Sequence, residues 1–415
     1  MSKRPPLLSV ADALERILDG VMPLPAETVP LALAPGRVLA TPLKALRTQP
    51  PFAASAMDGY AVRHADLQGV GTVLNKVGEA AAGHAYIGSV GSGDCVRIFT
   101  GAPLPQGTDT VLIQEDAETD GGSGVTVSEV PDKGRYVRPA GLDFAEGDTL
   151  LEANRVLSAA DVSLAAAMNH AALQVRRKPI VALISTGDEL VPPGTPRRAD
   201  QIVTSNNFGV AALVEEAGGF ALDLGIAADT HAALADAFDR AENADIVITL
   251  GGASVGDHDL VQDALTARGV GLGFWKLAMR PGKPVMFGTG TTTGNETANE
   301  SQPKRYLGLP GNPVSSLVCT HIFVLPLLRA LLGQPAATVL QDAVLAVDVP
   351  QNDQREEYMR ASVDKKDGVL HVTPYARQDS SILSGMAKAD CLMVRPAHSP
   401  PMRAGDPCKI VPLRG

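Results

Sequence analysis

Short apolar runs alternate with amphipathic segments between residues 179 and 333. The run PIVALIST, which begins at residue 179, is almost wholly apolar, as in strands that are buried on both faces of a sheet. The segments after it have alternately helical and strand-like periods: NNFGVAALVEEAGG, ALDLGIAA, HAALADAFDRAEN, ADIVITLGG and DLVQDALTARG. This alternation predicts βαβ units and a parallel sheet over residues 179–333.

The end of this region departs from the regular alternation of strands and helices. A strand is predicted at 284–288, and the polar segment 289–304 is expected to be a mobile loop without function. Residues 305–328 then predict a strand, a turn and a largely buried helix.

Helical periods also occur near the N-terminus and after residue 155. Residues 8–20 predict an amphipathic helix with Ser9 as its N-cap. Residues 155–177 predict a second helix, with Ser158 as N-cap and Asp161 in its first turn. We expect these two helices to pack together in one split domain, formed by residues 1–50 and 147–178.

The remaining parts of the chain predict β-structure. Residues 51–146 hold short strands separated by glycine, aspartate and proline turns, which predicts a small β domain. Residues 334–415 hold short strands at regular spacing, which predicts a terminal β-barrel or sandwich. The predicted fold class is therefore α/β multidomain, with a central parallel-sheet domain.

Composition and charge narrow the possible partners. The chain has 415 residues, more than one compact core usually holds, and a formal net charge of -10. This charge argues against nonspecific nucleic-acid binding, so an anionic ligand would need local cations, backbone N–H groups or a metal ion. Four scattered cysteines without a CxxC pair fit a reducing compartment. Neither a signal peptide nor a run of membrane-spanning length is evident, so we expect a cytoplasmic protein with no membrane partner.

Three polar or glycine-rich loops follow predicted strands of the central sheet. These loops are TGDEL after the first strand, GGASVGDHD at 251–259, and GLPGNP at 308–313. Ligands of parallel α/β sheets bind outside the carboxyl ends of the strands, so we expect the loops to form one site. Each loop taken singly is also compatible with an ordinary turn or a helix cap.

The loop at 251–259 combines a glycine-rich backbone with two carboxylates. It lacks the GK[ST] of a phosphate-binding P-loop and the GxGxxG dinucleotide fingerprint. Its backbone is suited to holding phosphate, and Asp257 with Asp259 to holding Mg²⁺ beside it. Alternatively, Asp259 only caps the following helix and Asp257 is solvated.

Two further segments carry candidate residues. Lys276, Arg280 and Lys283 lie within eight residues, which indicates either an anion site or a solvated basic turn. Asp58 followed by Gly59 predicts a turn and by itself indicates no function.

Six motifs in order resemble one family across nearly the whole chain. They are SAMDGYAV (55–62), FTGAPLPQGTDTV (99–111), STGDEL (185–190), GGASVGDHD (251–259), MRPGKP (279–284) and GLPGNPVS (308–315). Together they resemble the molybdopterin molybdenumtransferases, which include the bacterial MoeA-type proteins and the E domain of gephyrin.

The resemblance implies the last step of molybdenum cofactor synthesis. Family members bind adenylylated molybdopterin, hydrolyse its phosphoanhydride with Mg²⁺, insert molybdate at the dithiolene sulfurs and release AMP. The family also implies a homodimer whose cleft joins the α/β domain of one subunit to the small β domain of the other. Asp58 would then face the partner's α/β pocket. Other enzymes of cofactor synthesis are possible partners.

Residue roles follow from the motifs that match. The resemblance implies a catalytic group comprising Asp58, Thr100, Asp143, Glu189, Asp229 and Asp259. It implies metal ligands at Asp58, Asp257 and Asp259. The implied substrate-binding residues are Gly251, Gly252, Ser254, Gly256, Gly311, Asn312, Lys276, Arg280, Lys283, Arg355 and Ser380, with Arg355 and Ser380 contacting molybdate.

The sequence departs from the family pattern at three places. Ala53 follows Phe52 where the family often has an acidic residue, and Arg280 stands where many members have lysine. The segment 289–304 is longer than usual.

Three other functions are weighed against the transferase. The main alternative is a molybdopterin adenylyltransferase that uses ATP, because its α/β fold is shared. A binding scaffold of the gephyrin kind is disfavoured because no peptide groove can be recognised, and an oxidoreductase because the dinucleotide fingerprint is missing.

Overall fold

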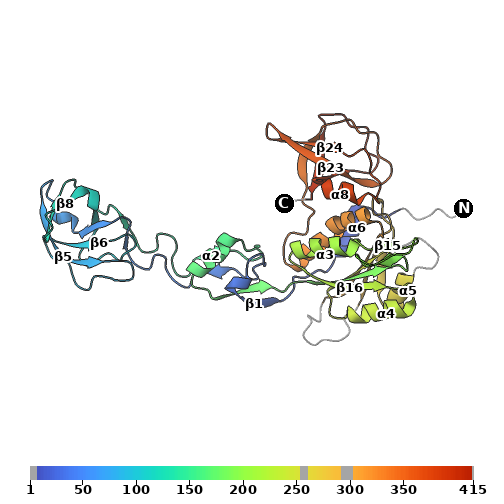
Figure 1. Ribbon diagram of the computed structural model, residues 1–415, viewed down its shortest axis with the longest axis horizontal. Helices are drawn as coiled ribbons and strands as arrows, with labels where there is room; N and C mark the ends of the chain where they lie inside the picture. The colour runs from blue at the N-terminus through green and yellow to red at the C-terminus, as the bar shows by residue number, and fades with distance from the viewer. Residues whose placement is uncertain (1–6, 253–259, 291–301, 414–415) are drawn as a thin grey trace. The chain divides into compact units, whose positions relative to one another are not determined.

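The computed structural model describes residues 7–252, 260–290 and 302–413. The chain forms two compact units (Figure 1). Unit 1 combines residues 1–27 with 175–415, and unit 2 is residues 28–174. Strands β1 (Ala26–Pro30) and β12 (Ala172–Arg176) carry the chain across the boundary. Division of the chain into four domains at the predicted boundaries stays a prediction.

A six-stranded sheet in the order β16-β13-β17-β21-β20-β18 forms the centre of unit 1. Its first four strands are parallel, as predicted, whereas β20 runs antiparallel to both of its neighbours, β21 and β18. The predicted parallel sheet is present over four strands, and β20 makes the whole sheet mixed. The strands are β13 (Ile180–Thr186), β16 (Phe220–Ala227), β17 (Ile246–Leu250), β18 (Gly271–Phe274), β20 (Met286–Gly290) and β21 (Lys304–Leu309).

Helices cover both faces of this sheet because its strands are apolar on both sides. Alternate residues of β13 enter two separate cores, with Val181 in one and Ala182 in the other. Figure 1 shows α3 and α6 on one face and α4 and α5 on the opposite face. The helices are α3 (Asn206–Glu216), α4 (His231–Arg240), α5 (Leu260–Ala267), α6 (Pro313–Cys319) and α7 (Leu325–Leu331), with a π-helical turn at Thr320–Val324 and a strand pair β14 (Leu190–Val191) and β15 (Ile202–Val203) before α3.

Helix α1 (Val10–Leu18) forms as predicted but packs elsewhere. The Ser9 hydroxyl caps it by accepting a hydrogen bond of 3.1 Å from the Asp12 N–H. Its buried face, which includes Ile17, joins the core of unit 1 together with residues of α7. The predicted packing against the helix of 155–177 is wrong, because that helix lies in unit 2. An amphipathic face requires a partner without specifying which one.

That second helix is also shorter than predicted. Helix α2 spans Ala159–Ala167, with Ser158 and Asp161 forming a capping box. Asn169 has a left-handed φ of 76°, which ends the helix. Residues 172–176 then form β12, whose side chains alternate in burial.

The helix Pro313–Leu331 corrects the expectation that no apolar run is long enough to span a membrane. It has 19 residues, and its most apolar 18-residue window has a mean hydropathy of 1.8, enough in length and composition to cross a membrane. However, 83% of its most apolar window is buried inside the protein. The segment is therefore a core helix of unit 1, as predicted for 305–328.

The C-terminal part of unit 1 is a closed barrel, which confirms the first of the two predicted forms. Five strands follow the ring β23-β24-β22-β26-β25, and β25 pairs back onto β23. Strand β19 (Met279–Arg280) adds to β23 from outside the ring. The ring consists of β22 (Gln341–Leu345), β23 (Glu356–Lys366), β24 (Val369–Pro374), β25 (Cys391–Arg395) and β26 (Pro407–Pro412), with α8 (Leu383–Lys388) beside it.

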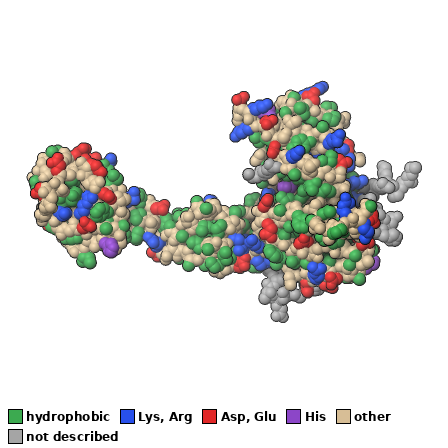
Figure 2. All heavy atoms as spheres, in the orientation of Figure 1, with side chains coloured by type: hydrophobic (Ala, Val, Ile, Leu, Met, Phe, Trp, Pro, Cys, Tyr) green, Lys and Arg blue, Asp and Glu red, His purple; other side chains and the backbone are tan. Residues whose placement is uncertain are grey.

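Unit 2 contains the predicted β-structure. Its main sheet has the order β7-β4-β6-β5-β9-β8, and alternation along β4 places Tyr60 and Ala61 in separate cores. The strands of unit 2 are β2 (Leu43–Lys44), β3 (Ala54–Ser55), β4 (Gly59–Val62), β5 (Val73–Ala80), β6 (Asp94–Ile98), β7 (Thr110–Ile113), β8 (Ala117–Thr119), β9 (Gly124–Val127), β10 (Val137–Arg138) and β11 (Thr149–Leu151). Acidic and basic side chains lie interspersed over the face shown in Figure 2.

Candidate functional site

Three strand ends bring the predicted loops together. Strands β13, β17 and β21 are parallel neighbours, and the Gly251 N–H donates to the Leu309 carbonyl oxygen at 3.1 Å. A cavity of about 540 Å³ opens beside them. The prediction that the three loops converge is confirmed, since the cavity is lined by residues of all three loops, among them Glu189, Gly251, Gly252, Gly311 and Asn312.

Glycine is required at the start of the 251–252 loop for two reasons. Gly251 and Gly252 have φ of 97° and 66°, in the left-handed region. A Cβ atom on Gly251 would also lie 2.7 Å from the Thr186 carbonyl oxygen, and one on Gly252 would lie 2.7 Å from the Thr186 Oγ1. The backbone therefore approaches β13 closely at the cavity wall.

Buried hydroxyl groups at the same edge lack partners. Ser185, Thr186 and Thr249 are 2–3% exposed, and within the described part of the chain their hydroxyl oxygens make no hydrogen bond. An unpaired buried hydroxyl costs roughly 1–3 kcal/mol, which a polar ligand can offset. Ser185 and Thr186 line the cavity. The sequence analysis missed them, although a hydroxyl residue at the end of an apolar strand is a readable signal.

Carboxylates gather where β13 and β16 end. The Asp229 N–H donates to the Asp188 Oδ1 at 3.1 Å. Burial raises the pKa of Asp229, and the nearby Asp188 and Glu189 carboxylates raise it further. Across residues 7–252, 260–290 and 302–413, no three His, Cys, Asp or Glu side chains are arranged to hold a metal ion. The structure thus gathers Glu189 with Asp229 without making a metal site of them.

Part of the predicted site cannot be placed. Ser254, Gly256, Asp257 and Asp259 lie outside the described residues. Their predicted roles in phosphate and metal binding stay predictions.

The PGN loop, residues 310–312, is hydrogen-bonded through Asn312 to the segment before α8. The Asn312 Nδ2 donates to the Ser380 Oγ at 2.9 Å, and the Val314 N–H donates to the Ser380 carbonyl oxygen at 3.2 Å. Two residues predicted to bind substrate, 68 positions apart, therefore lie together, and Asn312 lines the cavity.

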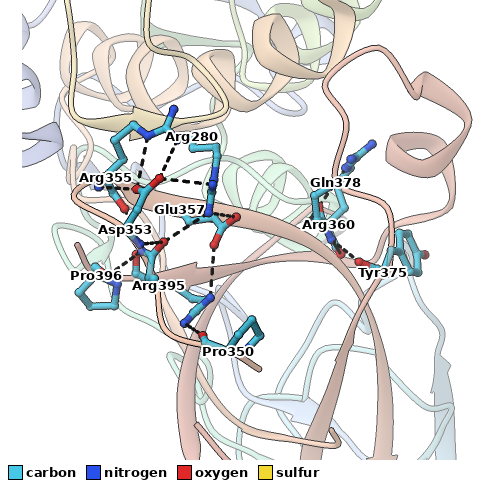
Figure 3. A network of polar contacts seen from close by, with 11 residues as sticks. Arg280, Pro350, Asp353, Arg355, Glu357, Arg360, Tyr375, Gln378, Arg395 and Pro396 are labelled. Carbon is cyan, nitrogen blue, oxygen red and sulfur yellow. Dashed lines mark hydrogen bonds and ion pairs between the residues drawn. The ribbon is translucent and has the colours of Figure 1, made fainter. Parts of the chain in front are cut away.

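Arg280 and Arg355 lie in an ion-pair network at the rim of the barrel (Figure 3). Arg280 Nη2 is 2.7 Å from Glu357 Oε1, and its Nη1 is 3.4 Å from Asp353 Oδ2. Arg355 Nη2 lies 2.7 Å from the same Asp353 oxygen. The hydrogen bond from Arg355 lowers the pKa of Asp353 to about 2. Both guanidinium groups are therefore paired with carboxylates, although the Arg280 Nε is buried without a hydrogen-bond partner among the described residues.

The sequence analysis missed the carboxylates of this network. Strand β19 pairs with β23, and this places Arg280 beside Glu357 across 77 positions of sequence. Glu357 also contacts the buried Arg395, at 3.4 Å. Lys276 and Lys283, the other two cations of the basic turn, are exposed.

In unit 2, Asp58 and Thr100, two residues of the implied catalytic group, lie side by side. The backbone N–H and the hydroxyl of Thr100 both donate to Asp58 Oδ1 at 2.8 Å. These hydrogen bonds lower the pKa of Asp58, with a smaller contribution from the Arg97 charge. The pairing arises because Gly59, at the start of β4, lies opposite Ile98, at the end of β6. Asp143 lies on a different turn, where its N–H donates to the Gln49 carbonyl oxygen at 3.0 Å.

Three successive regions of the chain match known protein families. Residues 8–169 match the MoeA N-terminal region (domains I and II), residues 182–330 match a probable molybdopterin binding domain, and residues 342–413 match the MoeA C-terminal region (domain IV). The molybdopterin biosynthesis MoeA protein from Pyrococcus horikosii is 27% identical, with a TM-score of 0.83 over 99% of this chain and 100% of that one.

Curated relatives agree with these matches. The molybdopterin molybdenumtransferase of Haemophilus influenzae is 34% identical over 98% of this chain and 99% of its own length. That of Nostoc sp. is 36% identical over 94% of this chain and 90% of its own. Both the predicted resemblance and the predicted enzyme class are confirmed: the chain belongs to the molybdopterin molybdenumtransferase family.

Proposed function

We propose that this protein inserts molybdenum from molybdate into adenylylated molybdopterin, with hydrolysis of the phosphoanhydride and release of AMP. Membership of the family supports molybdenum insertion in cofactor biosynthesis. The observation that carries the finer proposal is the cavity at the carboxyl edge, within the region that matches a molybdopterin binding domain. Its wall combines close-packed glycine backbone with buried, unpartnered hydroxyls, which suits a phosphate-bearing ligand.

Asp58 is the described residue that fits a magnesium ligand. The Thr100 hydrogen bonds lower the pKa of Asp58 and so favour its carboxylate form, and both of them go to one oxygen, Oδ1. Oδ2 is therefore left for a hard cation. Magnesium would supply charge neutralisation at the phosphates when bound. Thr100 holds the Asp58 carboxylate in a fixed orientation, and Asp257 and Asp259 remain the other proposed ligands.

The proposed active form is a homodimer in which Asp58 of one subunit serves the cavity of its partner. Glu189 lines that cavity, whereas Asp58 belongs to unit 2. Mixing inactive Asp58→Asn subunits with inactive Glu189→Gln subunits should restore about a quarter of wild-type activity, if exchange is random and each site needs both residues. No recovery in exchanged mixtures would argue for sites completed within one subunit.

Purified protein incubated with adenylylated molybdopterin, molybdate and Mg²⁺ tests the reaction. Molybdate-dependent release of AMP is expected. Asp58→Asn should lower turnover by about 100-fold, as for other groups that stabilise transition-state charge. Glu118→Gln, an exposed change in unit 2, should leave turnover unchanged.

The alternative activity has its own signature. A molybdopterin adenylyltransferase would release pyrophosphate from ATP and molybdopterin. Pyrophosphate release without molybdate-dependent AMP release would replace the proposed function with that alternative.

A further inference from the structure

Two of the three carbonyl groups of the PGN loop at 310–312, those of Pro310 and Gly311, accept hydrogen bonds from side chains. The Asn206 Nδ2 donates to the Gly311 carbonyl oxygen at 2.7 Å and to the Ser316 Oγ at 3.3 Å. The Ser316 hydroxyl in turn donates to the Pro310 carbonyl oxygen. Ser316 is fully buried, so this chain of donors is fixed by the core of unit 1.

The direction of the carbonyl groups sets the direction of the N–H groups. The peptide bonds of this loop are trans, since the cis bonds among the described residues are at Pro50 and Pro281. In a trans peptide, C=O and N–H point to opposite sides. The Gly311 N–H therefore points away from Ser316, and the Asn312 N–H points away from Asn206.

These two N–H groups are available to donate hydrogen bonds to a ligand. Neither the Gly311 nor the Asn312 N–H donates a hydrogen bond to another described residue. Both residues line the cavity and are exposed, so neither group is buried without a partner. Two successive N–H groups that are free to donate suit an anionic ligand.

We propose that Asn206 is a positioning residue, which acts with Ser316 to hold the 310–312 loop so that Gly311 and Asn312 donate to a phosphate oxygen of the substrate. Asn206 reaches the loop from the first turn of α3, 105 positions away in sequence. The inference rests on the proposed function, because it assigns the phosphate-bearing ligand to this cavity. It extends that function by naming the residue that prepares the loop before the ligand arrives.

The variants separate loop positioning from folding. Asn206→Asp keeps the size of the side chain but loses both donated hydrogen bonds and adds a negative charge. Asn206→Ala loses the bonds without the charge, and Asn206→Gln keeps a donor. Ala212→Asp adds the same charge to an exposed position of the same helix, away from the loop.

Binding of AMP and of adenosine to the full-length protein, measured by calorimetry, tests the proposal. Asn206→Asp and Asn206→Ala should weaken AMP about tenfold or more, the loss of one hydrogen bond to a charged group. Adenosine, which lacks phosphate, should bind all variants alike. Asn206→Gln should recover part of the AMP affinity, and Ala212→Asp should match wild type.

Two outcomes overturn the inference, and they differ from failure of the proposed function. Unchanged AMP affinity in Asn206→Ala and Asn206→Asp would show that the loop needs no such positioning. Equal loss of AMP and adenosine, with a lowered melting temperature, would assign Asn206 a structural role. If wild-type protein binds no AMP at all, the proposed function itself fails and takes the inference with it.

Discussion

The two edges of the central sheet of unit 1 differ in whether their buried polar side chains have hydrogen-bond partners. At the amino edge, where the parallel strands begin, the buried Lys304 and Arg305 side chains donate hydrogen bonds to backbone carbonyl groups. At the carboxyl edge, the hydroxyls of Ser185, Thr186 and Thr249 have no partner in the described structure. In the same sheet, buried polar side chains at the amino edge are therefore hydrogen-bonded within the protein, and buried hydroxyls at the carboxyl edge have no partner among the described residues.

Adjacent residues at the start of β21 show how the amino edge is completed. The buried Arg305 donates to the carbonyl oxygens of Ile17 and Asp19, at the end of α1, at 3.2 and 2.9 Å. Lys304 donates to those of Ala241 and Glu242, at the end of α4. Successive side chains of a strand point to opposite faces, so each cation reaches a helix on its own side. Cations also suit the negative end of the helix dipole.

The comparison indicates which edge contributes stability and which contributes binding. Buried polar groups are normally satisfied, so exceptions indicate a ligand or a strained site. Within the central sheet, the three hydroxyl exceptions lie where ligands of parallel α/β sheets bind. Substitutions at the amino edge should therefore change folding stability, and substitutions at the carboxyl edge should change ligand binding.

The largest expected effect is at Arg305. Arg305→Met should lower the free energy of unfolding by about 3–5 kcal/mol, because it leaves buried carbonyl groups without donors. Urea unfolding measures this change. Arg403→Met, which removes an exposed ion pair with Asp348, should change stability by less than about 1 kcal/mol. Equal effects of the two variants would remove the distinction drawn for the amino edge.

A second effect concerns His321, in the helix that runs between the edges. Burial lowers the pKa of His321 from 6.5 to about 4. Between these values the unfolded chain binds the proton more tightly, so stability should fall as pH drops from 6.5 towards 4. The loss should reach about 2–3 kcal/mol near pH 4. His321→Phe should lose this part of the pH dependence, as seen by subtracting its unfolding profile from that of wild type.

A third, smaller effect is expected at Asp245, before β17. Its carboxylate binds Arg177 through two hydrogen bonds of 2.8 and 3.0 Å and also accepts from the Ile180 N–H at 2.7 Å. Asp245→Asn should cost about 1–2 kcal/mol in thermal or urea unfolding, because it loses the charge-assisted part of these bonds. AMP affinity should stay unchanged, and a large drop would connect this edge to the site.

The smallest stability effect is expected at Thr249. Thr249→Val removes an unpartnered buried hydroxyl while keeping its shape, so stability should change by less than about 0.5 kcal/mol or rise slightly. If the hydroxyl meets the ligand, AMP affinity should fall severalfold. A clear loss of stability with normal AMP binding would show that the open hydroxyl serves the fold.

Much of the fold was readable from local pattern. The strands and helices of 179–333, the terminal barrel and the caps at Ser9 and Ser158 follow from periods of two and 3.6 residues and from helix-start chemistry. The convergence of three loops also followed, because parallel strands end at the same edge. Local pattern failed for the end of α2, where left-handed Asn169 intervenes.

By itself, the sequence determined which segments are strands or helices, which loops carry polar chemistry, and the family that those loops resemble. Only the tertiary structure decided that α1 packs in unit 1 and that β20 pairs antiparallel with β21 and β18. It also decided that Asp353 forms ion pairs with Arg280 and Arg355. The hydrogen bond from Asn206 to the 310–312 loop likewise depends on the tertiary structure. The physical reason is that hydrophobic period and residue type are local, so they show that a face or a charge needs a partner. The partner is chosen by packing and hydrogen bonding between segments that are tens to hundreds of positions apart.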